Sequence, residues 1–494
     1  MDFIRLKNTD SVALTDIPQL TLEHFRSVIK ELLEEKNCRV SAFFAEAGCL
    51  YAILLDPAER LFKVLACPVD AEYEALTPHI SALHWFEREL SEQSNIKVQN
   101  HPWLKPIRFE NSDQPGVTDY FTMQGSAAHE VAVGPVHAGV IEPGHFRFQC
   151  MGEDVYFLEI ELGYQHRGVE KMLISAPAKL RTHLVETAAG DSSIAYALAF
   201  DGVMSGLAEV PREKLSDRIQ VLRTLALELE RIANHVGDIG ALAGDVAFLT
   251  TSSYCGRIRG EFLNMTAQLC GNRFGRNYVT YSGVAYDLPN SELSSLREWF
   301  ERTVADFKNA WQIMADDPGV LDRLENTGTV PEKIMREIGA VGVAGRASGL
   351  DLDVRRDLGN IGVYDRLVWK VAVKNSGDVI ARTKVRRAEL RESIRMVRAL
   401  FTMLESLPQG VAGACAGPEK LSPQRLSVTA VEGWRGEVVC AGISGENGEL
   451  QRVKLVDPSF HNWFALSLAL RGEQISNFPI CNKSFNLSYC GHDL

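Results

Sequence analysis

Three long stretches of helical periodicity limit how this 494-residue chain can fold. Over residues 216–236, 291–314 and 379–407 the apolar residues recur three and four positions apart. This spacing puts them on one face of an α-helix, and such a face has to be buried against another element. The pattern therefore predicts that the larger part of the chain is a mostly α-helical domain.

The N-terminal part of the chain has a different pattern. Residues 21–36 have helical spacing, with Thr21 in position to cap the helix, and residues 80–90 predict a second helix. Between these helices lie three runs typical of strands, at residues 39–44, 50–55 and 61–66. Helices and strands in this order predict a small α+β domain.

Two hairpins are predicted in the larger domain. Apolar and polar residues alternate over residues 145–150 and 155–162, on either side of a turn, and a second pair of strands is predicted over residues 436–455. The fold class is therefore α+β, with a small α+β domain followed by a larger, mostly α-helical domain with small β-hairpins. We place the small domain at residues 1–112 and a polar, Gly- and Pro-containing linker at 113–130, with the larger domain at 131–494.

Composition excludes several classes of function. The net charge of -12 argues against a general nucleic-acid-binding surface, and no apolar run approaches the roughly 20 residues of a membrane span. The ten cysteines include no CxxC pair, so neither disulfides nor a zinc or iron-sulfur site of the usual kind is expected. The chain does not start with the basic and then apolar plan of an export signal, which predicts a cytoplasmic protein.

Two motifs near the start of the larger domain carry a resemblance. GPVHAGVIEPGHFRF (residues 134–148) and ELGYQHRGVEKML (residues 161–173) resemble the start of the large subunit of energy-converting, membrane-bound nickel-iron hydrogenases of the formate hydrogenlyase type. They are also similar to the quinone-site subunit of respiratory complex I. HWFERELSE and HPWLKPIRF resemble the 30-kDa complex I subunit that is fused in front of the large one. The resemblance continues in order through ETAAGDSSIAYALAF, ASGLDLDVRRDLG, VEGWRGE, VDPSFHNWFAL and FPICNKSFNLSYCGHDL.

The sequence departs from the hydrogenases at the metal ligands. The resemblance implies two CxxC pairs, and the matching positions hold Ala189 and Ser192 in the first pair and Ser488 and Gly491 in the second. Cys490 lies one position out of register. Thiolates hold both metals and carry negative charge to them, whereas a serine hydroxyl is neutral near pH 7. We therefore expect no metal site and no nickel-iron hydrogenase activity in this chain.

Residues around the missing ligands are candidates for catalysis. The resemblance implies that Glu142 and His145 line the cavity, where a carboxylate and an imidazole could relay protons. The alternative is a turn whose polar side chains bond only to the backbone. Arg435 matches the hydrogenase arginine that lies over the metals. Without metals it could bind an anionic or carbonyl group, or pair with Asp191, inside the altered first CxxC.

The HRGVEK motif has two interpretations. The resemblance implies that His166 and Arg167 face a partner subunit that carries an iron-sulfur cluster, with Glu170 and Lys171 bracing the interface. The alternative is an ordinary helix start with a salt bridge between Arg167 and Glu170.

Two further polar groups are interpreted as structural. The charges of DLDVRRDL, residues 351–358, are expected to form an ion-pair network rather than a catalytic site. His235 lies five residues after Glu230 on a predicted helix, so the two face different ways and His235 is expected to be a hydrogen-bonded core or surface histidine.

The leading hypothesis is a subunit of a membrane-associated redox complex, related to energy-converting hydrogenases and complex I, without the nickel-iron centre. It would couple electron transfer from a partner subunit's iron-sulfur cluster to ion translocation, with antiporter-like membrane subunits as further partners. It would bind no cofactor directly, with a quinone as the one candidate exception, and would lie on the inner face of the membrane through those partners. One alternative is a quinone-reducing subunit, with quinone near Tyr196 and protons from Glu142, His145 or Tyr196. Another is a non-catalytic scaffold that transmits conformational change.

Overall fold

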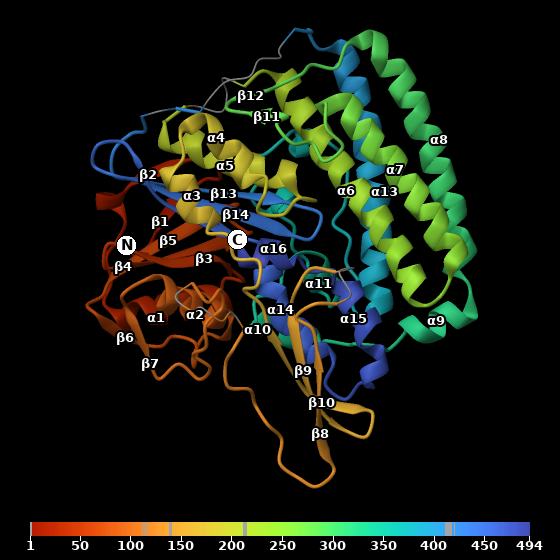
Figure 1. Cartoon of the computed structure of the whole chain (residues 1–494). Helices are drawn as coiled ribbons and strands as arrows, with labels where there is room; N and C mark the ends of the chain where they lie inside the picture. Colours follow the sequence, from red (N-terminus) through yellow and green to blue (C-terminus); the bar gives the residue numbers. More distant parts are fainter. Residues whose placement is uncertain are drawn as a thin grey trace.

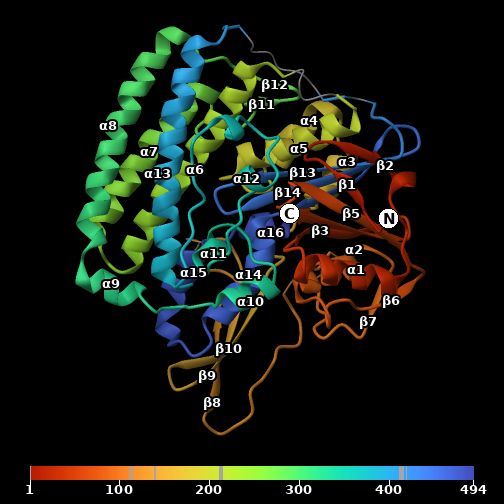
Figure 2. The ribbon, with the colours of Figure 1, turned by 180° about the vertical axis from the view of Figure 1, so that it is seen from behind.

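The larger domain is built around a layer of four long helices (Figures 1 and 2). The computed structural model describes residues 2–110, 112, 114, 116–137, 141–210, 215–410, 417–418 and 420–494. Within it the long helices lie side by side and bury their apolar faces against each other. They are α6 (Asp217–Asp245), α7 (Leu249–Cys270), α8 (Asn290–Ala315) and α13 (Val379–Ser406).

Each of the three periodic stretches is helical, and side-chain caps fix the starts of two helices. The hydroxyl of Ser216 accepts from the backbone N–H of Ile219 at the start of α6, and the carboxylate of Asp378 accepts from Ala381 at the start of α13. The expected cap at Thr21 was wrong, because its side chain makes no capping hydrogen bond to α1.

The sheet near the N-terminus has the strand order β1-β5-β4-β3 and is antiparallel throughout. The three strands expected from the sequence are β3, β4 and β5, and α1 and α2 are the two expected helices. The elements of this region are β1 (Ile4–Leu6), α1 (Leu22–Glu34), β3 (Arg39–Glu46), β4 (Cys49–Asp56), β5 (Leu61–Pro68), β6 (Glu72–Glu74), α2 (His84–Gln93) and β7 (Lys97–Gln99).

A second four-stranded sheet lies at the centre of the molecule, with the order β15-β14-β13-β2. Its first three strands come from the larger domain: β13 (Arg425–Glu432), β14 (Glu437–Ser444) and β15 (Leu450–Val456). The fourth is β2 (Ser11–Ala13), from the N-terminal part. The two parts therefore share a sheet, a connection that the sequence analysis did not include.

The third sheet, β10-β9-β8, projects from the lower end of the molecule in Figure 1. The predicted hairpin is β9 (His145–Met151) with β10 (Asp154–Glu161). A third strand, β8 (Ala128–Val133), pairs with β9 and takes the last three residues of the predicted linker. Residues 113 and 115 of that linker and residues 138–140 of the motif before β9 lie outside the described residues.

Shorter elements complete the fold. In the described residues no helix is both long and apolar enough to cross a membrane. The mixture of helices and small sheets confirms the α+β class. The remaining elements are β11 (Val279–Thr280), β12 (Gly283–Val284), α3 (Val169–Ser175), α4 (Ala178–Val185), α5 (Ser193–Leu207), α9 (Pro318–Leu324), α10 (Glu332–Glu337), α11 (Gly342–Ala347), α12 (Val354–Asp357), α14 (Pro458–Ala469), α15 (Phe478–Phe485) and α16 (Tyr489–Asp493), with single-turn 3-10 helices at Leu14–Asp16, Ser81–Leu83, Tyr364–Arg366 and Ile475–Asn477.

Candidate functional site

The two segments that match the hydrogenase ligand pairs lie next to each other. Ala189 and Ser192 are buried in the turn before α5, and Ser488 is buried at the start of α16. Arg167 joins the two segments, because one nitrogen of its guanidinium donates to the backbone oxygens of Ala188 and Cys490, at 3.1 and 3.0 Å. The positions that the resemblance assigns to metal ligands therefore do converge on one place.

Arg435 and Asp191 form a bidentate salt bridge at this place. The two terminal nitrogens of Arg435 lie 2.7 and 2.8 Å from the carboxylate oxygens of Asp191. The third nitrogen donates to the backbone oxygen of Asn486 at 2.6 Å, and the guanidinium lies 3.9 Å from the ring centre of Trp434. Burial acts to raise the pKa of Asp191, but the positive charge of Arg435 lowers it below the usual value. The predicted pairing of these residues is confirmed.

Close backbone packing fixes the position of Arg435. It lies in the turn between β13 and β14, where the N–H of Gly433 donates to the oxygen of Gly436. Gly342, at the start of α11, packs against this turn with a positive φ of 62°. A Cβ atom at Gly342 would lie 1.9 Å from the backbone oxygen of Arg435, so only glycine fits there.

Tyr196 and Asp457 form a second polar pair in the same pocket. The hydroxyl of Tyr196 donates to the carboxylate of Asp457 at 2.6 Å, and Asp457 also accepts from the N–H of Ser459 as the cap of α14. Burial and this carboxylate raise the pKa of Tyr196 well above its usual value. Asp457 fills the space beside Gly491, where a Cβ atom would lie 2.4 Å from its carboxylate oxygen.

Replacing Gly491 with alanine should destabilise the protein by about 1–3 kcal/mol, because the new methyl group would overlap the Asp457 carboxylate. Gly256→Ala on α7 is the matched control, since a Cβ atom there meets nothing within 4 Å. The control should leave stability unchanged or raise it by up to about 1 kcal/mol. Urea unfolding followed by circular dichroism measures both, and equal effects of the two substitutions would contradict the packing argument.

Cys490 and Glu142 lie beside these two pairs. The thiol of Cys490 is 3.4 Å from the hydroxyl of Ser488 and bonds to the carboxylate of Glu142. Burial, together with the negative charge of Glu142, raises the pKa of this thiol to about 12. Cys490 therefore carries its proton at neutral pH, so it does not offer the thiolate that a metal would need.

The donor atoms of the pocket do not fit a nickel-iron centre. The four matching positions provide two hydroxyls and no sulfur, and the space is crossed by the salt bridge of Arg435 with Asp191. In the part of the chain that the structure describes, no group of three or more His, Cys, Asp and Glu residues is arranged to hold a metal ion.

His145 and Glu142 have different surroundings. His145 is buried, contacts the ring of Tyr120 and lies 3.4 Å from the backbone oxygen of Gly134. Burial lowers its pKa, so the ring is neutral at pH 7. Glu142 instead interacts with Cys490. The proposed relay between the two side chains stays a prediction, because each of them bonds to a different group.

His166 and Arg167 hold the last residues of the chain. His166 contacts the backbone oxygen of Asp493 at 2.8 Å, and the N–H of Arg167 donates to the oxygen of Leu494. The alternative salt bridge between Arg167 and Glu170 was wrong. Glu170 is buried and accepts from Lys454 at 3.1 Å, which ties α3 to β15. The charged residues of this motif thus face inward, apart from the partly exposed Arg167 and the exposed Lys171.

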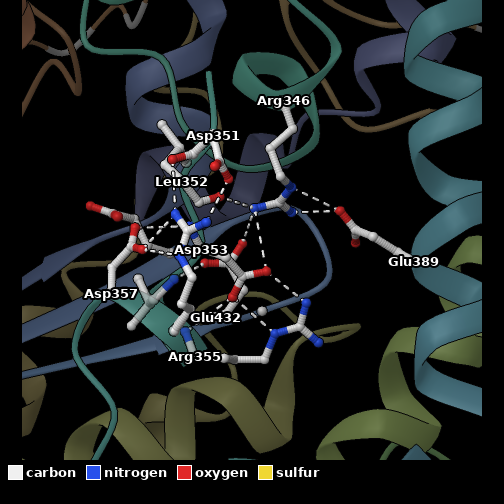
Figure 3. A network of polar contacts seen from close by, with 12 residues as sticks. Arg346, Asp351, Leu352, Asp353, Arg355, Asp357, Glu389 and Glu432 are labelled. Atoms are coloured by element: carbon white, nitrogen blue, oxygen red, sulfur yellow. Dashed lines mark hydrogen bonds and ion pairs between the residues drawn. The ribbon is translucent and has the colours of Figure 1, made fainter. Parts of the chain in front are cut away.

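The charges after residue 350 belong to a buried ion-pair network (Figure 3). Arg346 on α11 lies 2.7 Å from Glu389 of α13 and 2.7 Å from Glu432 of β13, and Arg355 pairs with Asp353 at 2.7 Å. Burial and the negative charge of Asp353 raise the pKa of Glu432 to about 7. The interpretation of this segment as a structural network is confirmed by these contacts.

His235 belongs to the same network and not to a site with Glu230. Its ring is fully buried and lies 2.8 Å from the carboxylate of Glu389, whose pKa is lowered by Arg346 and by this contact although burial acts to raise it. The ring also contacts Trp434, next to Arg435. The network therefore ends one side chain away from the pocket.

Two residues of the pocket were not predicted from the sequence. Asp457 could have been found, because Asp followed by Pro and Ser is typical of a capped helix start. Glu230 is buried behind the pocket, where it accepts from the N–H of Ile194 at 2.8 Å. The residues around Glu230 have an ordinary helical pattern, which carries no signal of this contact.

Comparison with known proteins gives relatives for most of the chain. A model of the respiratory-chain NADH dehydrogenase 49 kDa subunit matches residues 245–425. Formate hydrogenlyase subunit 5 of Escherichia coli is 25% identical over 473 residues, which are 89% of this chain and 80% of that protein. A subunit of the NADH-quinone oxidoreductase of Clostridium beijerinckii is 28% identical over 345 residues, which are 70% of this chain and 91% of that protein.

A solved structure supports the fold. A chain of the membrane-bound sulfane sulfur reductase, an archaeal respiratory membrane complex, aligns with a TM-score of 0.68 and 24% sequence identity. The alignment covers 74% of this chain and 99% of the other. At this identity the similarity shows that the two chains share a fold. The resemblance to hydrogenase and complex I subunits that the motifs predicted is confirmed by these matches.

Proposed function

Since the chain is homologous to formate hydrogenlyase subunit 5 and to the quinone-site subunit of complex I, we propose that it is the corresponding subunit of a membrane-associated redox complex that works without a nickel-iron centre. The observation that carries the proposal is the salt bridge of Arg435 with Asp191, in a pocket whose four ligand positions hold no cysteine. Electrons would come from an iron-sulfur cluster on a partner subunit.

The pocket has the groups needed to couple electrons to protons. Arg435 is a fixed positive charge at a largely buried site, where it stabilises negative charge more than it would in water. Glu142, Tyr196 and Cys490 carry or accept protons at the same site. An acceptor reduced beside Arg435 would therefore gain charge stabilisation and protons together.

Arg167 is the proposed contact with the electron donor. Its partly exposed guanidinium connects the segments on both sides of the pocket through the backbone oxygens of Thr187, Ala188 and Cys490. A cluster on a partner subunit that docked over Arg167 would lie close to the pocket, and the positive charge would favour its reduced form. Membrane subunits of the antiporter type would be further partners, holding the chain at the inner face of the membrane and moving the ion.

A quinone is the acceptor we consider second. The relative from Clostridium beijerinckii is named as part of an NADH-quinone oxidoreductase, which favours this acceptor. A quinone carbonyl could accept a hydrogen bond from Arg435 or Tyr196 if the pairs with Asp191 and Asp457 opened. A scaffold without chemistry of its own is the third candidate, in which the two pairs would stay closed.

Analysis of the purified complex tests the proposal. The complex is isolated through an affinity tag on this chain, its nickel and iron are measured by mass spectrometry, and quinone is extracted and quantified by chromatography. We expect nickel far below one atom per chain, with iron at the amount that the partner's clusters need. One nickel atom per chain would overturn the proposal. Bound quinone would establish the second acceptor, and a complex that transfers no electrons would leave the scaffold.

A further inference from the structure

A group of buried acids lies behind the salt bridge of Asp191 with Arg435. One carboxylate oxygen of Glu230, on α6, accepts from the N–H of Ile194 in the first turn of α5. The other oxygen is buried and has no hydrogen-bond partner among the described residues. Asn234, one turn further along α6, donates to the backbone oxygen of Asp191 at 2.9 Å. Glu230 is thus in contact with the segment that carries the altered ligand positions.

A second buried acid, Glu186, lies between Glu230 and the surface. It follows α4 directly and accepts from the N–H of Asn277 at 2.9 Å. The side chain of Asn277 bonds to the exposed ring of His183. The buried thiol of Cys270, on α7, is affected by the charges of both acids, which places it close to each of them. The four side chains form a series from the exposed ring of His183 to the interior.

The surroundings favour the neutral form of both acids. Burial and the negative charge of Asp191 raise the pKa of Glu230 to about 8, against the opposing effects of Arg231 and the N–H of Ile194. Burial raises the pKa of Glu186 to about 7, opposed by the N–H of Asn277 and by Arg276. At pH 7 Glu230 therefore carries a proton, on the oxygen that does not accept from Ile194.

We propose that Glu230 is a proton-holding residue for the Asp191 and Arg435 pocket, and that it is refilled from solvent by way of Glu186. The inference rests on the proposed function. A quinone reduced in the pocket takes two electrons from the partner subunit's cluster and two protons. The O–H bond of Glu230 breaks to give one proton, Glu142 gives the other, and both carboxylates regain protons from solvent. No electron passes through Glu230.

The substitution Glu230→Gln separates this role from a purely structural one. Glutamine has the shape of the protonated acid and keeps an oxygen for the N–H of Ile194, but it has no proton to release. In the purified complex, infrared difference spectra recorded before and after reduction with dithionite should contain a band of a buried carboxylic acid. This band should be missing in the variant, and electron transfer to a short-chain ubiquinone should fall about tenfold or more. An unchanged spectrum and rate in the variant would overturn the inference.

Thermal unfolding of the full chain gives a second test. The pKa of Glu230 is about 8 in the folded state, well above its usual value, so the folded state keeps a proton that the unfolded chain releases. Its contribution to stability is complete below about pH 4.5 and is lost as the pH rises towards 8. Glutamine lacks this loss. The Tm of Glu230→Gln minus that of the wild type should therefore rise between pH 5 and pH 8, and a constant difference would contradict a raised pKa.

Glu87→Gln is the control for both measurements. Glu87, on α2, is also a buried carboxyl with a raised pKa, caused by burial, but it bonds to Tyr73 and Thr77 in the N-terminal part of the chain. Its substitution should leave the dithionite-induced infrared band unchanged. The inference can fail while the proposed function holds, because nickel and quinone content do not depend on Glu230. Conversely, a nickel-containing complex would overturn the function and leave the Tm test of Glu230 intact.

Discussion

Replacing Arg346 with methionine should lower the free energy of unfolding by about 3–5 kcal/mol. The guanidinium is fully buried and pairs with Glu389 and Glu432, and it also donates to the backbone oxygen of Leu352 at 3.0 Å (Figure 3). Methionine fills much of the same volume, so the loss comes from two carboxylates that stay buried without their partner. Urea unfolding at pH 8, followed by circular dichroism, measures it.

The pH dependence of this loss identifies its cause. Without Arg346 the folded-state pKa values of both carboxyls should rise, because burial is then less compensated. Protonation of the folded state at low pH relieves the cost, so the variant should be less destabilised at pH 5 than at pH 8. Arg398→Met is the matched control, because Arg398 pairs with Glu301 between exposed side chains and should contribute about 0–1 kcal/mol. A loss for Arg346→Met as small as that of this control would show that the network does not stabilise the fold.

The sequence predicted the elements that depend on local periodicity. The three long helical stretches became α6, α8 and α13, and the three strand-like runs became β3, β4 and β5, because each has a single apolar pattern over many residues. The pairing of Arg435 with Asp191 was also predicted. It followed from the resemblance, since the two motifs meet at one pocket in the hydrogenases and the lost thiolates leave a charge that needs a partner.

Contacts between distant segments could not be predicted in this way. Glu389 bonds to His235 across 154 residues, and neither residue has a neighbour in the sequence that points to the other. The pairing of β2 with β13 was missed because β2 has only three residues, too few for a period of two to be recognised. The side chain of Asn8 helps to hold this edge in place, donating to the backbone oxygens of Gly359 and Ala430.

The motif HRGVEK shows why charges in a sequence do not indicate what they face. Glu170 is nearly fully buried, and both Lys454 and the N–H of Leu455 donate to it. Burial alone would raise its pKa, but Lys454 and two arginines lower it to about 2. A helix start rich in charge can thus be part of the core when the partner charge comes from a strand 284 residues further along the chain.

The substitution Asp191→Asn should have the largest effect on activity. It keeps the shape of the side chain but leaves the guanidinium of Arg435, whose side chain is 9% exposed, without its counter-charge. Because the Asp191 side chain is itself 32% exposed, solvent reduces the cost, and we expect a loss of about 2 kcal/mol of stability. Electron transfer through the complex should fall by about 10²-fold, since Arg435 would no longer be held in one orientation at the acceptor.

The control for Asp191→Asn is Asp351→Asn, at the exposed edge of the network. Asp351 pairs with Arg356 at 2.6 Å, with side chains 63% and 41% exposed, so its loss should change stability by less than about 1 kcal/mol and leave electron transfer unchanged. The charge of Asp191 also raises the pKa of Glu230. Asp191→Asn should therefore shift the titration of the Glu230 infrared band to lower pH, and a shift to higher pH would contradict the electrostatic coupling of these two acids. Electron transfer that survived Asp191→Asn at the wild-type rate would mean that the salt bridge only fills the space left by the metals.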